Sequence, residues 1–278
     1  MKFDSNLAAV HAYLCADGYV IKNPETQKHK YYHIALRNTN LTLLEDFQKK
    51  FYNVFGVSPK ITNGRCIIHS KELFYVLTKE YCYYSYKWTL PKLTTNTLKL
   101  WLRAFFDCEG WVELQKAKSR SIRTDSVNLK GLTQVQMALR RFEIKSTIKK
   151  SKKNLWRLSI CGFDDIKKYA KNIGFLHPSK KQRLKDVLTS YKSYKWTIPT
   201  EKNELIKFLY KQGKIRKERN ELRLFSIKRG NIDSINESLR KCGIDSKVQG
   251  PWKNNTGSLY FCLVLKEDKI KVMQTNGS

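Results

Sequence analysis

A seven-residue segment occurs twice in the chain with a single Leu/Ile exchange, as SYKWTLP at 85–91 and as SYKWTIP at 193–199. Trp is a rare residue, and a match that keeps Tyr, Trp and Pro in the same order indicates duplication rather than chance. We therefore expect consecutive copies of one folding unit, which meet at these two segments.

The segments around the heptapeptides share one order of predicted elements three times. Each copy begins with an apolar helical run that ends at a glycine, Gly18, Gly110 or Gly213, and a glycine there is typical of a helix stop. Two strands, a second helix, a hairpin and a third helix follow, with turn residues such as TNG, SKKN and KNNTG in the hairpins. The predicted fold class is therefore α+β, built from tandem units. The predicted domains are residues 1–91, 92–199 and 200–278.

The charge of the chain indicates its class of partner. Its 278 residues include 54 Lys and Arg against 24 Asp and Glu, a formal net charge of +30. This excess is larger than solubility needs and favours a polyanion, most often nucleic acid. Seven cysteines, an odd number without a CxxC pair, argue against a disulfide framework or a zinc ribbon.

Membrane and secretory segments are not predicted. The chain has no apolar run of about 18 residues, the length that a membrane helix needs. The apolar run at its start is too short for a signal peptide and is broken by His11. We expect an intracellular protein of the cytoplasm, the nucleoid or an organellar matrix, without membrane contact.

The positive charge concentrates in the middle copy. Residues 92–199 hold 25 basic and 8 acidic residues, a net charge of +17. Alternate residues of a strand face one side, so Lys116, Lys118 and Arg120 are expected to share a face, which Arg123 joins only after a bulge or turn. A solvated surface is the alternative to a nucleic-acid face. The candidate DNA contacts are Lys22, Arg37, Lys116, Lys118, Arg120, Arg123, Lys145, Lys149, Arg157 and Lys228.

The residue before each helix-stopping glycine is Asp17, Glu109 or Gln212. A carboxylate at a helix C-terminus opposes the helix dipole, so two acids at matching positions indicate a function that outweighs this cost. Hard oxygen ligands suit Mg²⁺, and two carboxylates brought together can share ions for phosphodiester hydrolysis. The alternative is a pair of solvated surface acids.

Small residues predict which of these helices pair. Ala12 and Ala16 in the first helix, and Ala104 and Cys108 in the second, occupy matching positions four residues apart and allow two helix backbones to approach closely. The third helix has lysines at both positions, and a tight crossing would bury their ammonium groups. We expect the first two helices to pair and to bring the two acids together, while the third stands apart.

The segments VHAYLCADG (10–18) and LRAFFDCEG (102–110) resemble the LAGLIDADG motif of homing endonucleases. The second segment matches at Leu102, Ala104, Asp107 and Gly110, and by charge at Glu109. The first departs from the motif at Cys15 and His11, and the third copy, LIKFLYKQG (205–213), matches only by alignment. The resemblance covers residues 5–190 well and the remainder partially.

This resemblance implies tandem αββαββα units with saddle-shaped antiparallel sheets over DNA, in a monomer with internal pseudo-two-fold symmetry. It implies that Asp17 and Glu109 bind Mg²⁺, with Mn²⁺ as a substitute, helped by the carbonyls of Ala16 and Cys108. It also implies a basic residue near the centre, for which Arg37 and Arg123 are candidates.

The function expected from these features is site-specific, metal-dependent cleavage of both strands of DNA. The alternatives are an intron maturase that binds RNA, and a DNA-binding regulator that does not cut. The third copy, which has Gln212 in place of an acid, is expected to be a degenerate nucleic-acid-binding module, or else a covering module that adds only stability.

Overall fold

The computed structural model describes residues 2–115, 120–191, 195–254 and 258–270. The chain divides into two compact units, residues 1–190 and 191–278, each with its own architecture. None of the helices in the described residues is long and apolar enough to cross a membrane.

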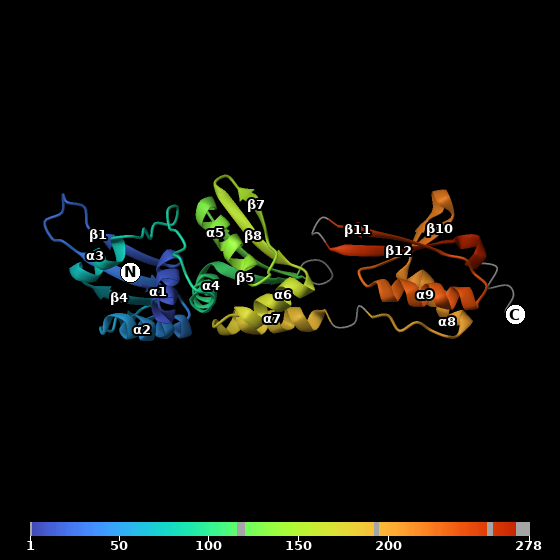
Figure 1. Ribbon diagram of the computed structural model, residues 1–278, viewed down its shortest axis with the longest axis horizontal. Coiled ribbons are helices and arrows are strands. Elements are labelled where there is room, and N and C mark those ends of the chain that lie inside the picture. Colours follow the sequence, from blue (N-terminus) through green and yellow to red (C-terminus); the bar gives the residue numbers. More distant parts are fainter. Residues whose placement is uncertain (1, 116–119, 192–194, 255–257, 271–278) are drawn as a thin grey trace. The chain divides into compact units, whose positions relative to one another are not determined.

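The first unit contains two copies of the repeat (Figure 1). The first copy consists of α1 (Ser5–Cys15), β1 (Gly18–Lys22), β2 (Tyr32–Arg37), α2 (Leu41–Phe55), β3 (Lys60–Thr62), β4 (Arg65–His69) and α3 (Lys71–Thr78). The second consists of α4 (Thr95–Glu109), β5 (Gly110–Leu114), β6 (Arg120–Ser126), α5 (Leu129–Arg140), β7 (Thr147–Lys152), β8 (Leu155–Cys161) and α6 (Phe163–Asn172). A further helix, α7 (Pro178–Ser190), completes this unit.

The second unit is a third copy. It consists of α8 (Lys202–Gln212), β9 (Lys214–Arg216), the 3₁₀ turn η1 (Lys217–Arg219), β10 (Glu221–Ser226), α9 (Arg229–Lys241), β11 (Lys247–Lys253) and β12 (Leu259–Lys266), after which residues 267–270 are helical. All three copies form a four-stranded antiparallel sheet with the same strand order, β1-β2-β4-β3, β5-β6-β8-β7 and β9-β10-β12-β11. The α+β fold class and the repeated αββαββα pattern are thus confirmed.

The tryptophan of each heptapeptide docks on the copy that follows it. Trp88 is 2% exposed, and its carbonyl accepts a 2.7 Å hydrogen bond from Asn128 Nδ2 at the start of α5. The Trp196 amide donates correspondingly to Asn231 Oδ1 at the start of α9, over 3.0 Å. These contacts favour a boundary between copies that lies before each heptapeptide. The boundaries at residues 92 and 200 stay predictions.

The motif glycines owe their place to close packing rather than to a left-handed backbone. Gly110 and Gly213 both have φ −86°, a conformation open to any residue. A Cβ on Gly110 would lie 2.6 Å from the Phe106 carbonyl oxygen, and one on Gly213 would lie 2.7 Å from that of Leu209. The strand turns back tightly against the last helical turn in each case, so only glycine fits.

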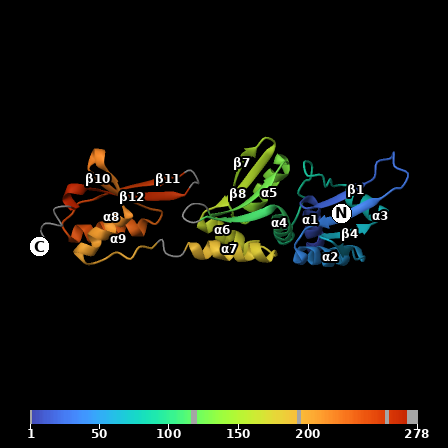
Figure 2. The ribbon, with the colours of Figure 1, turned by 180° about the vertical axis from the view of Figure 1, so that it is seen from behind.

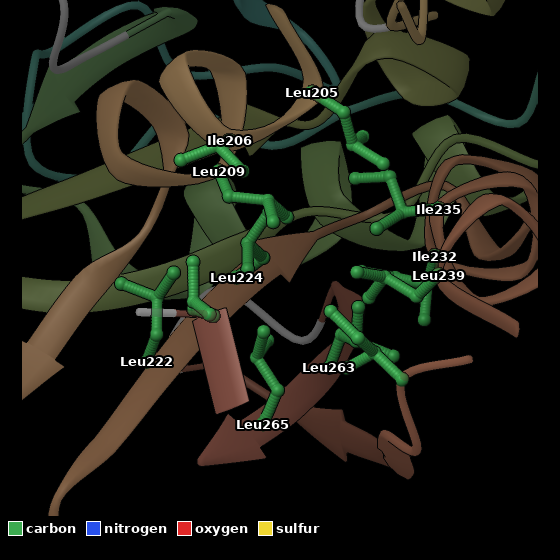
Figure 3. Close-up of a cluster of buried hydrophobic side chains, with 12 residues drawn as sticks. Leu205, Ile206, Leu209, Leu222, Leu224, Ile232, Ile235, Leu239, Leu263 and Leu265 are labelled. Carbon is green, nitrogen blue, oxygen red and sulfur yellow. The ribbon is translucent and has the colours of Figure 1, made fainter. Parts of the chain in front are cut away.

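Each sheet has a helix-covered face and an opposite face. In the second unit, Leu222, Leu224, Leu263 and Leu265 point from the strands into a core shared with α8 and α9 (Figure 3). Both helices lie on the same side of this sheet in the two ribbon views (Figure 1 and Figure 2). Because strand residues alternate, the intervening residues of β10 and β12 lie on the open face.

Candidate functional site

The two motif helices of the first unit pack against each other, as the small residues predict (Figure 1). Ala12 is 0% exposed on α1 and Ala104 is 3% exposed on α4. Bulkier side chains at these positions would separate the backbones. The predicted pairing of the first two motif helices is confirmed, while α8 belongs to the other unit.

A buried histidine joins the two helices. His11 is 1% exposed, and its Nδ1 accepts a 3.1 Å hydrogen bond from the Trp101 indole N–H of α4. Burial lowers the pKa of His11 to about 3, so the ring is neutral at pH 7. His11 is larger than the small residue usual at this position of the motif, and its hydrogen bond with Trp101 links the two helices.

Asp17 follows α1 and is held by the second strand of its own copy. Its Oδ2 accepts a 2.7 Å hydrogen bond from Asn38 Nδ2, and its carbonyl accepts one of 3.2 Å from the Arg37 amide. Its carboxylate also reaches α4, where burial and then the charge and hydrogen bond of Asp17 raise the pKa of the Cys108 thiol. Asp17 therefore lies where the ends of α1 and α4 meet.

Glu109 ends α4 and shares this place with Asp17. Its pKa is raised to about 7, first by burial and then by the negative charge of Asp17, with Asp125 adding to the shift. Lys180 acts in the opposite direction. Two carboxylates in mutual repulsion are the arrangement that the sequence predicts for Asp17 and Glu109.

Lys180 of α7 supplies a positive charge that the sequence analysis missed. Its ammonium donates to the carbonyl oxygens of Asp107 and Cys108, over 2.5 Å and 3.1 Å, at the end of α4. Burial lowers its pKa, while Cys108 and the acids around it raise it. A cation is favourable at a helix C-terminus, so Lys180 offsets the cost of placing Glu109 there.

Asp107 of the motif fastens α7 in this position. It is 1% exposed, and its carboxylate accepts hydrogen bonds of 3.0 Å from the amides of Leu176 and His177, directly before α7. Burial raises its pKa to about 6, against the lowering effect of these bonds. Asp107 therefore fixes the helix that carries Lys180.

Strand register decides which residue faces each acid. In the first copy Gly18 pairs with Leu36, so the register sets Asp17 opposite Arg37. In the second copy Gly110 pairs with Thr124, so the register sets Glu109 opposite Asp125. Asp125, not Arg123, thus corresponds to Arg37. Arg123 lies two residues earlier and binds Glu113, with 2.6 Å between Nη2 and the carboxylate oxygen. Of the two basic candidates, only Arg37 is adjacent to an acid of the centre.

The open face of the second sheet is largely paired. Arg157 forms a two-bond ion pair with Asp125, each bond 2.8 Å long, and its guanidinium lies 5.1 Å from the centre of the Trp111 ring. Such pairs fix side chains in place but leave less free charge for phosphates than the count of basic residues suggests.

The expectation that Arg120 belongs to this basic face is wrong. β6 runs without a register shift, so Arg120 has the orientation of the buried Ile122 and Thr124, on the helix side. Its Nε donates to Ser190 Oγ of α7 over 2.7 Å. Lys116 and Lys118 lie outside the described residues.

The remaining candidate DNA contacts are exposed side chains. Lys149 lies on the edge strand β7 of the second sheet, Lys145 lies in the segment before that strand, and Lys228 precedes α9. Lys22 is exposed at the end of β1, with its ammonium 3.9 Å from Glu25. Their exposure permits a role in binding DNA, which stays a prediction.

The oxygen donors at the centre fit a hard divalent cation in part. The carboxylates of Asp17 and Glu109 repel each other, and the Ala16 carbonyl lies beside the first of them in the chain. The Cys108 carbonyl already accepts a bond from Lys180. Within the described ranges, no group of three or more His, Cys, Asp and Glu side chains could hold a metal ion. A cation here would therefore depend on the two acids and on oxygen atoms of the backbone, the solvent or the substrate.

Comparison with known proteins supports the resemblance. A family model described as a LAGLIDADG-like domain matches residues 96–174, which run from α4 to the end of α6. The homing endonuclease I-ApeI of Aeropyrum pernix is 26% identical over 149 residues, 50% of this chain and 67% of that protein. The "Probable translation initiation factor IF-2" of Methanocaldococcus jannaschii is 28% identical over 109 residues, 37% of this chain but only 9% of that protein.

Solved structures give distant similarities. The homing endonuclease I-DmoI in complex with DNA and Ca has 16% identity and a TM-score of 0.48, covering 65% of this chain and 99% of that one. Full-length DUF199/WhiA from Thermatoga maritima has 14% identity and a TM-score of 0.46, covering 76% and 68%. The sequence matches, together with the paired motif helices, confirm that the chain carries a LAGLIDADG-like domain and is related to the LAGLIDADG homing endonucleases.

Proposed function

We propose that the chain is a site-specific, metal-dependent endonuclease that cuts both strands of double-stranded DNA, working as a monomer. The observation that carries the proposal is the meeting of Asp17 and Glu109 at the adjacent ends of α1 and α4, where burial and then the charge of Asp17 raise the pKa of Glu109. The relation to I-ApeI, a homing endonuclease, supports the same function. We also propose that the protein acts inside the cell.

Asp17, Glu109 and the Ala16 carbonyl are the proposed ligands of Mg²⁺, for which Mn²⁺ can substitute. A bound divalent cation would stabilise negative charge on the phosphate and lower the pKa of a water molecule. Asn38 orients the Asp17 carboxylate, and Lys180 fixes the carbonyls that precede Glu109. Glu109 is only partly ionised near pH 7, because its pKa is about 7. A bound cation would favour its ionised form.

The proposed DNA contacts are the charged residues of the open sheet faces. Arg37 and Arg65 are directly opposite each other on β2 and β4, on the side away from the core. Two like charges so close repel each other and gain from an anion placed between them. Arg157, Lys149 and Trp111 form a second group around β8.

A regulator that binds DNA without cutting it is the second candidate. The observation in its favour is the Lys180 ammonium, which occupies the Cys108 carbonyl that the family resemblance assigns to a metal. A maturase that binds intron RNA would keep the same basic surfaces, and the following experiment separates both alternatives from a nuclease.

The experiment is a cleavage selection from a randomised DNA library with Mg²⁺. The parent is expected to produce discrete double-strand cuts, whereas the Asp17→Asn/Glu109→Gln variant binds the selected site without cutting it. A Glu45→Gln/Glu72→Gln variant makes the same change of net charge at exposed positions of the first copy and should cut normally. DNA binding without any cuts by the parent would favour the regulator, and cuts by the double variant would refute the proposed ligands.

A further inference from the structure

Three aromatic side chains form a row across the sheet of the second unit. Phe225 on β10, Tyr260 on β12 and Trp252 on β11 come from adjacent strands. The ring centres of Trp252 and Tyr260 are 5.6 Å apart, and those of Phe225 and Tyr260 are 6.3 Å apart. Phe225 is 40% exposed and Trp252 is 39% exposed. The row is thus a continuous aromatic surface within reach of solvent.

The row lies on the face opposite the hydrophobic core. On β10, Phe225 alternates with Leu222 and Leu224, which are 0% exposed and point toward α8 and α9 (Figure 3). Tyr260 likewise alternates with the buried Leu263 and Leu265 of β12. Aromatic clusters usually pack in cores, but the core of this unit is complete without these rings, so packing does not account for them.

One end of the row, Phe225, occupies a position that is charged in the other two copies. In the third copy Lys214 pairs with Arg223, so the register, extended by two residues, sets Gln212 opposite Phe225. Phe225 therefore has the position that Arg37 and Asp125 have in the other two copies. Gln212 stands correspondingly where Asp17 and Glu109 stand. The third copy therefore lacks the ionisable pair of the cleavage centre and has an aromatic surface instead.

Basic side chains share the face of the sheet on which the row lies. Residues 200–278 carry 17 Lys and Arg against 9 Asp and Glu, a net charge of +8. By strand alternation, the exposed basic residues on the same face of the sheet as the row are Lys214, Arg216, Lys247 and Lys266. An exposed aromatic surface that shares its face with positive charge is complementary to a polyanion whose own rings are free to stack.

We propose that this face binds an unpaired segment of RNA, with bases stacked on Trp252, Tyr260 and Phe225 and with phosphates near the flanking lysines. Stacking needs bases that are not already paired, so duplex DNA does not satisfy the aromatic row. Unpaired loops and ends are the form in which RNA is usually recognised, whereas cellular DNA is mostly duplex, which favours RNA over single-stranded DNA. This site is separate from the proposed cleavage centre and does not depend on it.

The test is the affinity of the full chain for a labelled 12-nucleotide oligouridine, measured at elevated salt to suppress binding by charge alone. Each ring removed is expected to weaken binding about tenfold, so Trp252→Ala should show a loss of about tenfold and the Phe225→Ala/Tyr260→Ala/Trp252→Ala variant a loss of about 1,000-fold. In the parent, the RNA should also quench tryptophan fluorescence, and Trp252→Phe should remove this quenching.

The matched control is Tyr84→Ala/Tyr86→Ala. This pair is even more exposed than the row, at 55% and 57%, and its rings stack with their centres 5.9 Å apart, but it lies in the first unit. The control should bind oligouridine like the parent, and the triple variant should retain its circular dichroism and its cleavage of duplex DNA. Parental affinity in the triple variant would overturn the proposal, as would equal loss in the control. Equally tight, ring-dependent binding of oligothymidine would overturn the assignment to RNA.

Discussion

The ends of α1 and α4 are equivalent in the duplicated fold, yet the charges around them differ. Asp17 at the first end has Arg37 beside it on β2 and a neutral amide, Asn38, on its carboxylate. Glu109 at the second end has Asp125 in the place of Arg37 and receives its positive charge from Lys180 of α7. The positive charge near Asp17 thus comes from a strand of its own copy, whereas the positive charge near Glu109 comes from α7, a helix that follows the repeat.

This difference shows how a duplicated centre can diverge without losing its geometry. The contacts that set the backbone, the small interface residues and the glycines against the last helical turn, are present at both ends. The charges depend on single side chains that change without moving the backbone. The two ends should therefore respond unequally to equivalent substitutions, and the following predictions test that inequality.

The largest effect is expected for cleavage. Asp17→Asn and Glu109→Gln should each reduce double-strand cutting at least about 10³-fold, since a metal contributes several kcal/mol to such reactions. Residual nicking of one strand should survive better in Glu109→Gln, because the Lys180 ammonium remains at that end. The measurement is strand-resolved cleavage of a site selected from the library. Equal residual nicking in both variants would mean that the two ends work alike.

The next effect concerns the interface that both ends share. The pKa of His11 is about 3 in the folded protein, below its ordinary value of 6.5, so the unfolded chain binds the proton more tightly. The stability that neutral His11 allows is present above pH 6.5 and is lost as the pH falls toward 3, by roughly 4 kcal/mol.

Urea unfolding as a function of pH measures this loss. His11→Phe should show a shallower fall of the free energy of unfolding with acid than the parent, whatever its stability at pH 7. His29→Ala, a change at an exposed histidine of the same copy, should follow the parent. A parental slope in His11→Phe would show that acid acts elsewhere than at the α1–α4 interface.

Much of this arrangement could be predicted from local sequence. The heptapeptides and the glycine-terminated runs predict the three copies, and the four-residue spacing of Ala12 with Ala16, and of Ala104 with Cys108, predicts the pairing of α1 and α4. These features depend on residues close together in the chain and on helical periodicity, which short segments reveal.

The charges of the centre could not be predicted in the same way. The connection between β1 and β2 covers residues 23–31, whereas that between β5 and β6 covers 115–119. The position of Arg123 near the end of its predicted strand therefore resembles that of Arg37, while the observed pairing of Gly110 with Thr124 places Asp125 there instead. Lys180 was missed because it lies on a helix without counterpart in the first copy, and its partners are on α4, far away in the sequence.

A smaller effect is expected from removing Lys180. Lys180→Met deletes charge-assisted hydrogen bonds at the end of α4 and should lower the free energy of unfolding by about 2 kcal/mol. It should also raise the pKa of Glu109 further, because Lys180 lowers it, and so move metal binding to higher pH. Manganese binding followed by electron paramagnetic resonance measures this shift. Lys180→Arg should retain most of the stability, and Lys181→Met, an exposed neighbour, should change neither quantity.

The smallest effect sharpens the comparison at Glu109 itself. Its folded pKa of about 7 lies above its ordinary value of 4.5, so the folded protein binds this proton more tightly than the unfolded chain. The corresponding stability is complete below pH 4.5 and is lost as the pH rises through 7. The free energy of unfolding of Glu109→Gln should therefore rise relative to that of the parent by about 1 kcal/mol between pH 5 and pH 8, a value reduced for the partial exposure of this side chain.

This gain should be measured without divalent cations and then with Mg²⁺. The cation stabilises ionised Glu109, so it should stabilise the parent at pH 8 and reduce or reverse the advantage of Glu109→Gln. Glu45→Gln, an exposed change of the same kind, should show no pH-dependent gain. A difference between Glu109→Gln and the parent that stays constant from pH 5 to pH 8 would contradict the raised pKa.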